Sequence, residues 1–261
     1  MNIQKYLHEG GSPEDLEQHL MDLDSTFRFK CRRCGKCCKN QDTIIFTPRD
    51  IYNIAHKFGK TMEQVIKEIA EVYPGRDSRM PIVHMVPRGP KNACPLLVDG
   101  RCSVHDCKPT VCALFPLGRV IWFDRTLPLE QQLDNIQVRY IVNDIDCGSA
   151  KRINTVRDWL GRFGIAENDE FFIRWNRLFI RTSSVMRKLE EAHCPPTLLV
   201  VFWRTVFKDF YLNYDTSKEF MPQFLAMTDQ VEPLIRTLDA APISQAIESL
   251  EEHYGKTGTN Q

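Results

Sequence analysis

The sequence predicts an α+β fold: a small cysteine-cluster domain with short strands and helices, followed by a mainly α-helical C-terminal region. Two observations support this prediction. Eight of the ten cysteines lie between Cys31 and Cys112, among short apolar runs and turn residues. From Asn154 onward, apolar residues recur at helical spacing and Cys194 is the single cysteine. The change in pattern separates the chain into two parts of different character.

Composition limits the classes of partner. Hydrophobic residues make up 43% of the 261 and charged residues 26%, which is typical of a globular protein. Lys and Arg total 34, as do Asp and Glu, so the formal net charge is zero. A nucleic-acid-binding protein usually carries a basic excess. We therefore predict no nucleic-acid partner.

No apolar run approaches the roughly 20 residues that span a bilayer. The longest candidate, residues 197–207, is short and contains Arg204. The first ten residues are polar and have no apolar segment of the kind found in signal peptides. These features predict no membrane association and a cytoplasmic location, where thiols stay reduced.

Four segments are expected. Residues 1–26 form an N-terminal segment with a helix that begins near Ser12. Residues 27–150 form the cysteine-cluster domain, residues 151–254 the helical region, and residues 255–261 a disordered polar tail.

Short strands are predicted at 43–46, 82–86, 120–123 and 138–142. Thr47 can cap a helix with Pro48 in its first turn and Gly59 after its end, and a second helix starts at Thr61.

The C-terminal region shows helical patterns at about 154–162, 168–191, 196–213 and 228–253. In the second of these helices we expect an apolar stripe to pack in the core and a row of arginines to form a solvated face. The stripe is Trp175, Leu178, Phe179, Thr182, Met186 and Leu189, and the arginines are Arg174, Arg177 and Arg181.

The thiol pattern indicates a metal site. Cys31-x-x-Cys34 allows one tight turn to direct two sulfurs at one ion, and Gly35 can adopt the left-handed conformation that such turns use. Cys37 and Cys38 are adjacent, so their side chains diverge. Neighbouring arginines and lysines would offset the negative charge of several thiolates.

A second group of thiols lies further along the chain, in CPLLVDGRCSVH (94–105) and KPTVCALFP (108–116), and Cys147 comes before Gly148. Together with CRRCGKCC (31–38) and the helix start TPRDI (47–51), these motifs resemble the YkgJ-type cysteine-cluster proteins. That family is described by a zinc- or iron-chelating domain. The resemblance covers about residues 27–148 and implies eight ligands: Cys31, Cys34, Cys37, Cys38, Cys94, Cys102, Cys112 and Cys147.

Other residues near these thiols rank below the eight. Cys107 stands where the family more often has another residue, and His105 at this spacing is more often structural. Asp99, Asp106 and Asp146 are close to cysteines in sequence alone, and Cys194 is expected to be a plain thiol.

Four cysteines suit both tetrahedral zinc and a 4Fe–4S cluster. Cys94-Pro95 is reminiscent of ferredoxin ligation, and the two Cys-x-x-Cys knuckles of a zinc ribbon are missing, so iron–sulfur is favoured over zinc. The ferredoxin run itself is not met, because Cys38 directly follows Cys37.

Three functions remain open. The first is an iron–sulfur or zinc protein with a redox, sensing or metal-handling task. The second is an S-adenosylmethionine-dependent protein lysine N-methylase, because the cysteine pattern also resembles flagellin lysine methylases. No G-x-G pair for the usual cofactor loop is present to support it. The third is a structural-zinc module whose C-terminal helices bind a protein partner.

Overall fold

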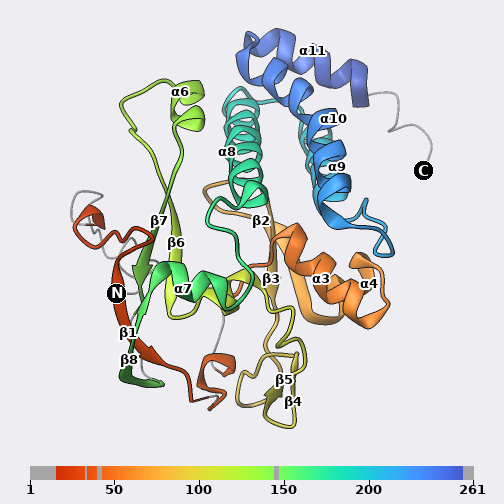
Figure 1. Cartoon of the computed structure of the whole chain (residues 1–261). Helices are drawn as coiled ribbons and strands as arrows, with labels where there is room; N and C mark the ends of the chain where they lie inside the picture. Colours follow the sequence, from red (N-terminus) through yellow and green to blue (C-terminus); the bar gives the residue numbers. More distant parts are fainter. Residues whose placement is uncertain (1–15, 33, 40–42, 144–146, 255–261) are drawn as a thin grey trace. The chain divides into compact units, whose positions relative to one another are not determined.

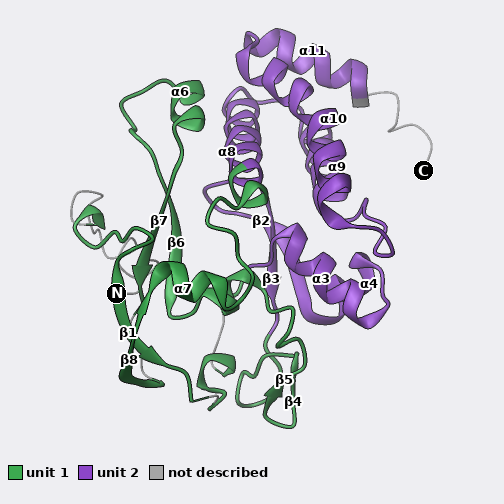
Figure 2. Ribbon diagram, viewed as in Figure 1, with its two compact units in different colours: residues 1–44, 87–173 green, residues 45–86, 174–261 purple. Residues whose placement is uncertain are grey.

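The computed structural model describes residues 16–32, 34–39, 43–143 and 147–254 (Figure 1). Short antiparallel strands and helices alternate in the first two-thirds of the chain, and the remainder is helical. The predicted α+β class and the helical C-terminal region are confirmed. By its contacts the chain forms two compact units, residues 1–44 with 87–173 and residues 45–86 with 174–261 (Figure 2).

Unit 1 is built on three two-stranded antiparallel pairs. The pairs are β1 (Thr26–Lys30) with β8 (Ser149–Thr155), β4 (Leu97–Val98) with β5 (Arg101–Cys102), and β6 (Leu117–Trp122) with β7 (Gln137–Val142). Three short helices complete the unit: α5 (Thr110–Leu114), α6 (Leu129–Asp134) and α7 (Val156–Gly161).

The core of unit 1 is aromatic. Phe27 and Phe29 alternate with exposed residues along β1, so both rings point inward and meet the Trp159 ring edge-on at centroid distances of 5.6 and 5.7 Å. The indole nitrogen of Trp159 donates to the Leu114 carbonyl at 2.9 Å. This bond ties α7 to the helix that carries Cys112.

The N-terminal segment joins this unit through β7. Met21 and Tyr140 exchange two backbone hydrogen bonds of 2.7 and 2.9 Å, and Leu16 is buried. The expected helix start at Ser12 and the tail after Tyr254 lie outside the described residues.

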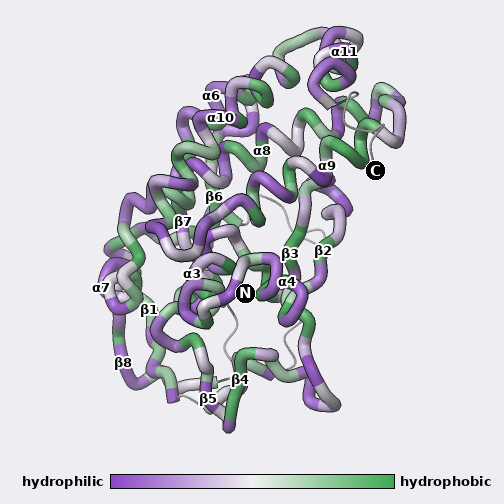
Figure 3. Tube along the Cα trace, turned by 90° about the vertical axis from the view of Figure 1, so that its right-hand side faces the viewer, coloured by the Kyte–Doolittle hydropathy of each residue, from purple (hydrophilic) through white to green (hydrophobic). Residues whose placement is uncertain are grey.

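Unit 2 contains the helices α3 (Pro48–Phe58), α4 (Met62–Ile69), α9 (Pro196–Tyr211), α10 (Phe220–Ala240) and α11 (Ile243–Tyr254), most of α8 (Glu170–Glu191), and the hairpin β2 (Ala70–Pro74) with β3 (Pro81–Met85). Hydrophilic and hydrophobic colours alternate along α8 and α9 in Figure 3, as expected for helices with one apolar face. Trp175 of α8 packs edge-on against Phe210 of α9 at 5.4 Å. The Tyr211 hydroxyl donates to the Phe46 carbonyl at 3.1 Å and links α9 to the segment before α3.

The predicted organisation of residues 27–150 as one domain stays a prediction, but the compact units divide the chain differently. Residues 45–86 make their contacts within the second unit. The Tyr211–Phe46 hydrogen bond and the packing of α9 on α3 and β3 explain this grouping. Such long-range contacts leave no trace in local composition.

Two element predictions are wrong. Residues 43–46 do not form a strand; only Ile45 makes an isolated bridge, to His84. Residues 228–253, predicted as a single helix, belong to two helices. α10 begins earlier, at Phe220, and ends before Ala241-Pro242, where the proline lacks a backbone N–H donor. Lys188 donates to three carbonyls at that break, those of Leu238, Asp239 and Ala241, at 2.6 to 2.9 Å.

The prediction that the arginines of α8 form a solvated face is also partly wrong. Arg181 is 3% exposed rather than solvated, and its guanidinium lies 3.5 Å from the carboxylate of Asp239. A buried arginine is tolerated because the carboxylate offsets its charge. The apolar stripe packs as predicted: Trp175, Leu178, Thr182, Met186 and Leu189 are all buried, and Phe179 is half-buried.

The start of α3 provides a first prediction. The Thr47 hydroxyl accepts from the Asp50 backbone N–H, and the Asp50 carboxylate accepts from the Thr47 backbone N–H at 2.9 Å, which is a complete capping box. Thr47→Ala removes one side of it and should lower the free energy of unfolding by about 1 kcal/mol. Urea titration measures this loss. Thr47→Ser keeps the hydroxyl and serves as the control, and a serine variant as unstable as the alanine variant would contradict the capping role.

No helix in the described part of the chain is both long enough and apolar enough to cross a bilayer.

Candidate metal centre

The β1–β8 ladder brings two of the predicted ligands to the same place. Lys30 pairs with Ser149, so Cys31 continues from one strand while Gly148 and Cys147 precede the other. Cys147 packs partly against the core residues of this unit. Cys31 is exposed and Cys147 half-buried. The sequence analysis missed this pair of strands, although the alternation Thr26-Phe-Arg-Phe-Lys30 is a period-two strand signal.

Gly148 allows this approach. Its φ is +73°, and a Cβ built on it would lie 2.4 Å from Cε2 of Phe29 and 2.9 Å from the Lys30 carbonyl oxygen. No side chain fits in that space. Glycine at 148 therefore holds Cys147 close to β1.

The four-cysteine octapeptide turns sharply at Gly35. This residue has φ +70°, as the sequence predicted, and a short 3-10 helix (Lys36–Cys38) follows, in which the Cys38 N–H donates to the Gly35 carbonyl at 3.0 Å. A Cβ on Gly35 would lie 3.8 Å from the carbonyl oxygen of Gly100. The turn thus lies beside the β4–β5 hairpin.

One backbone hydrogen bond joins the two cysteine groups. The Cys94 N–H donates to the Cys38 carbonyl at 2.8 Å, and Lys39 and Ala93 form an antiparallel bridge next to it. The Leu97 N–H then donates to the Cys94 carbonyl at 3.0 Å and closes a turn. This turn leads into β4.

The β4–β5 hairpin returns the chain to the same place. Its two turn residues, Asp99 and Gly100, have φ of +50° and +74°, and Leu97 pairs with Cys102. Cys102 therefore returns beside Leu97, three residues after Cys94, which is itself hydrogen-bonded to Cys38.

Four of the thiols affect one another's ionisation. The pKa of Cys38 is raised well above its usual value, first by its hydrogen bond with Cys37, then by burial, and then by the negative charge of Cys37, Cys94 and Cys102. Burial also raises the pKa of Cys94, although the backbone N–H of Leu96 donates to this sulfur and opposes the shift. Thiols that resist ionisation together are stabilised as thiolates when a cation binds between them.

Cys112 lies in α5. Pro109 is the N-cap of this helix, and its carbonyl accepts the N–H groups of Cys112 and Ala113, both at 2.9 Å. Phe29 and Phe115 lie on either side of this corner with ring centroids 5.9 Å apart. Leu114 and Phe29 of the unit 1 core are each two residues from a predicted ligand, Cys112 and Cys31, and Cys147 packs against the core directly.

The remaining candidates are dispersed. Cys34, His105 and Asp106 are exposed, Cys107 is half-buried behind the Val104 turn, and Asp146 lies outside the described residues. Cys194 belongs to unit 2 and is buried. All ten cysteines are present as thiols. Across the described ranges, no three Cys, His, Asp or Glu side chains are arranged to coordinate one ion, so the eight-ligand set stays a prediction.

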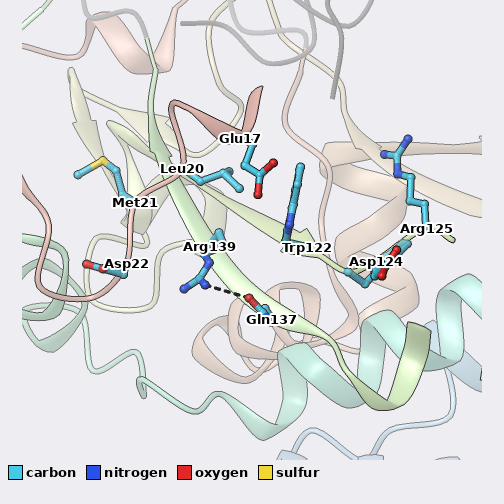
Figure 4. Close-up of a pocket in the computed structure, with 10 residues that line it drawn as sticks. Glu17, Leu20, Met21, Asp22, Trp122, Asp124, Arg125, Gln137 and Arg139 are labelled. Carbon is cyan, nitrogen blue, oxygen red and sulfur yellow. Dashed lines mark hydrogen bonds between the residues drawn. The ribbon is translucent and has the colours of Figure 1, made fainter. Parts of the chain in front are cut away.

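Unit 1 also has a polar cavity of about 720 Å³ between the N-terminal segment and β6–β7 (Figure 4). It contains no cysteine, and the sequence analysis did not predict it. Trp122 and Arg139 line it together with the carboxylates of Asp22 and Asp124, which already accept hydrogen bonds from Ser25 and Thr126.

The structure is thus an α+β fold in which short strands and turns bring free cysteines from distant segments toward one another. Residues 30–135 of the chain match the family model CxxCxxCC, described as a putative zinc- or iron-chelating domain. The match confirms the resemblance to a cysteine-cluster family and supports metal binding. It includes seven of the eight predicted ligands, and Cys147 lies beyond its end.

No curated protein and no solved structure matches the chain.

Proposed function

We propose that this protein holds an iron–sulfur cluster, most simply 4Fe–4S, through cysteine thiolates and uses it in electron transfer or metal handling in the reducing cytoplasm. The observation that carries the proposal is the neighbourhood of Cys37, Cys38, Cys94 and Cys102. These thiols come from two distant segments and are held together by the Cys94–Cys38 backbone bond. Core packing does not account for this set, because Cys37 is exposed and the other three thiols are half-buried.

The donor chemistry fits the proposed group. Thiolates are the ligands of iron–sulfur clusters and of structural zinc, and four sulfurs suffice for either. The Leu96 N–H already donates to the Cys94 sulfur, and such hydrogen bonds tune cluster potentials. Cys94-Pro95 favours iron–sulfur over zinc, as the sequence analysis argued. The other four predicted ligands, Cys31, Cys34, Cys112 and Cys147, then either form a second four-cysteine site or are spare thiols of a single cluster.

Metal analysis and absorption spectra of anaerobically purified protein test the proposal. We expect iron and acid-labile sulfide in near-equal amounts and a brown protein whose broad visible absorbance is bleached by dithionite. A colourless protein with stoichiometric zinc would replace it with the structural-zinc function. Protein without any bound metal would overturn both. Saturable binding of S-adenosylmethionine would instead favour the methylase alternative.

A further inference from the structure

The outward face of the β1–β8 ribbon combines positive charge with an exposed apolar side chain. Along β1, Arg28 and Lys30 are exposed while the intervening phenylalanines are buried. Arg28 pairs with Ile153, which is 57% exposed, and the register shifts between Arg28 and Lys30, so that residues 150–152 of β8 do not alternate and Lys151 is exposed as well. Three exposed cations, Arg28, Lys30 and Lys151, therefore lie on the same two-stranded ribbon as one exposed isoleucine.

No acidic residue within either ribbon segment compensates this charge. Between residues 26 and 39 the sequence contains Arg28, Lys30, Arg32, Arg33, Lys36 and Lys39 and no Asp or Glu; between 147 and 157 it contains Lys151, Arg152 and Arg157 and again no acidic residue. Arg157 is paired with Asp24 and Glu167. Among the described residues, Arg28, Lys30 and Lys151 form no ion pair. Because the chain as a whole has a formal net charge of zero, these residues form a local excess of positive charge.

Compensation of the thiolates does not account for all of these cations. Arg28 is three residues from Cys31 and Lys151 four residues from Cys147. At about 3.3 Å per residue along a strand, these charges are roughly 10–13 Å away, which exceeds the Debye length of about 8 Å at physiological salt. Their effect on the thiols is therefore screened.

Exposed apolar side chains accompany the thiols elsewhere in unit 1. Among its described residues, the large hydrophobic side chains that are exposed are Val98, Val111 and Ile153. Val98 lies in the hairpin between Cys94 and Cys102, and Val111 precedes Cys112. Apolar contacts ringed by charge are typical of protein–protein interfaces.

We propose that the ribbon face formed by Arg28, Lys30, Lys151 and Ile153 docks an acidic protein surface whose apolar contact meets Ile153. A nucleic acid is less well matched, because a phosphate backbone gains nothing from the central isoleucine. The inference goes beyond the proposed function and does not depend on it, because none of the four residues is a predicted ligand. Docking here would place the partner at the end of the ribbon where Cys31 and Cys147 lie.

Binding of labelled acidic polymers tests this face. The full-length protein, with its metal content measured, is titrated with polyglutamate, with a copolymer of glutamate and tyrosine, and with duplex DNA. We expect the copolymer to bind most tightly, with an affinity that falls as salt is raised. The double variant Arg28→Glu/Lys151→Glu should weaken it by at least about tenfold, because attraction becomes like-charge repulsion.

Two further variants make the test specific. Ile153→Ser should remove the preference for the tyrosine copolymer over polyglutamate while leaving polyglutamate binding intact. Arg125→Glu/Arg204→Glu makes the same change of net charge at exposed positions off the ribbon and should leave binding unchanged. Equal losses in the two double variants, or tighter binding to DNA than to either polymer, would overturn the proposal. Unchanged metal content in the ribbon variants separates this result from a failure of the metal site.

Discussion

Cys94→Ser is expected to abolish metal binding. Cys94 lies where the two cysteine groups meet, since its N–H bonds to the Cys38 carbonyl and its sulfur shares a neighbourhood with Cys37, Cys38 and Cys102. A serine hydroxyl is a poor ligand for the metals that thiolates select. Metal-coupled folding contributes free energy on the order of 10 kcal/mol in small zinc domains, so the variant should also unfold at lower temperature. Metal per chain and thermal unfolding measure both effects.

The same loss is expected for Cys34→Ser and Cys112→Ser, two further members of the proposed set. Cys194→Ser is the matched control, because its thiol is buried in unit 2, where burial and then the charge of Glu251 raise its pKa. A buried hydroxyl there costs roughly 1–3 kcal/mol of stability and leaves the metal in place. Full metal retention in Cys94→Ser would refute the proposed centre.

Gly148→Ala should strongly destabilise unit 1. The left-handed φ of +73° costs an alanine about 1–2 kcal/mol. The new Cβ would also collide with the Phe29 ring and the Lys30 carbonyl, and overpacking of this kind costs roughly 1–3 kcal/mol more. We expect the free energy of unfolding to fall by roughly 2–5 kcal/mol in urea titrations. Metal content should fall too, because Cys147 moves with its neighbour.

Gly164→Ala separates the two causes. Gly164 also lies in unit 1 and has φ +63°, but a Cβ there would meet no described atom within 4 Å. Gly164→Ala should lower the free energy of unfolding only by the cost of the left-handed φ for alanine, and it should leave the metal content unchanged. Equal destabilisation by the two alanines would show that the close packing of Gly148 on β1 is unimportant.

Several local features could be predicted because neighbouring residues decide them. Thr47, Pro48 and Gly59 delimit α3 through capping chemistry, and Gly35 takes the left-handed turn. The apolar stripe of α8 could be predicted from the helical spacing of its apolar residues. The helix break at Pro242 was missed because the apolar spacing continues across it, and the burial of Arg181 was missed because its partner, Asp239, is remote in sequence.

By itself, the sequence determined the chemistry of this protein: a set of soft thiol donors, the turns that carry them and the α+β class. Only the tertiary structure decided which thiols are neighbours. The Cys94–Cys38 backbone bond brings Cys37 and Cys38 near Cys94 and Cys102, and the pairing of Lys30 with Ser149 brings the segments of Cys31 and Cys147 side by side. These pairings join residues as far apart in sequence as Cys38 and Cys94, or Lys30 and Ser149, and local sequence patterns do not specify which distant segments will pair.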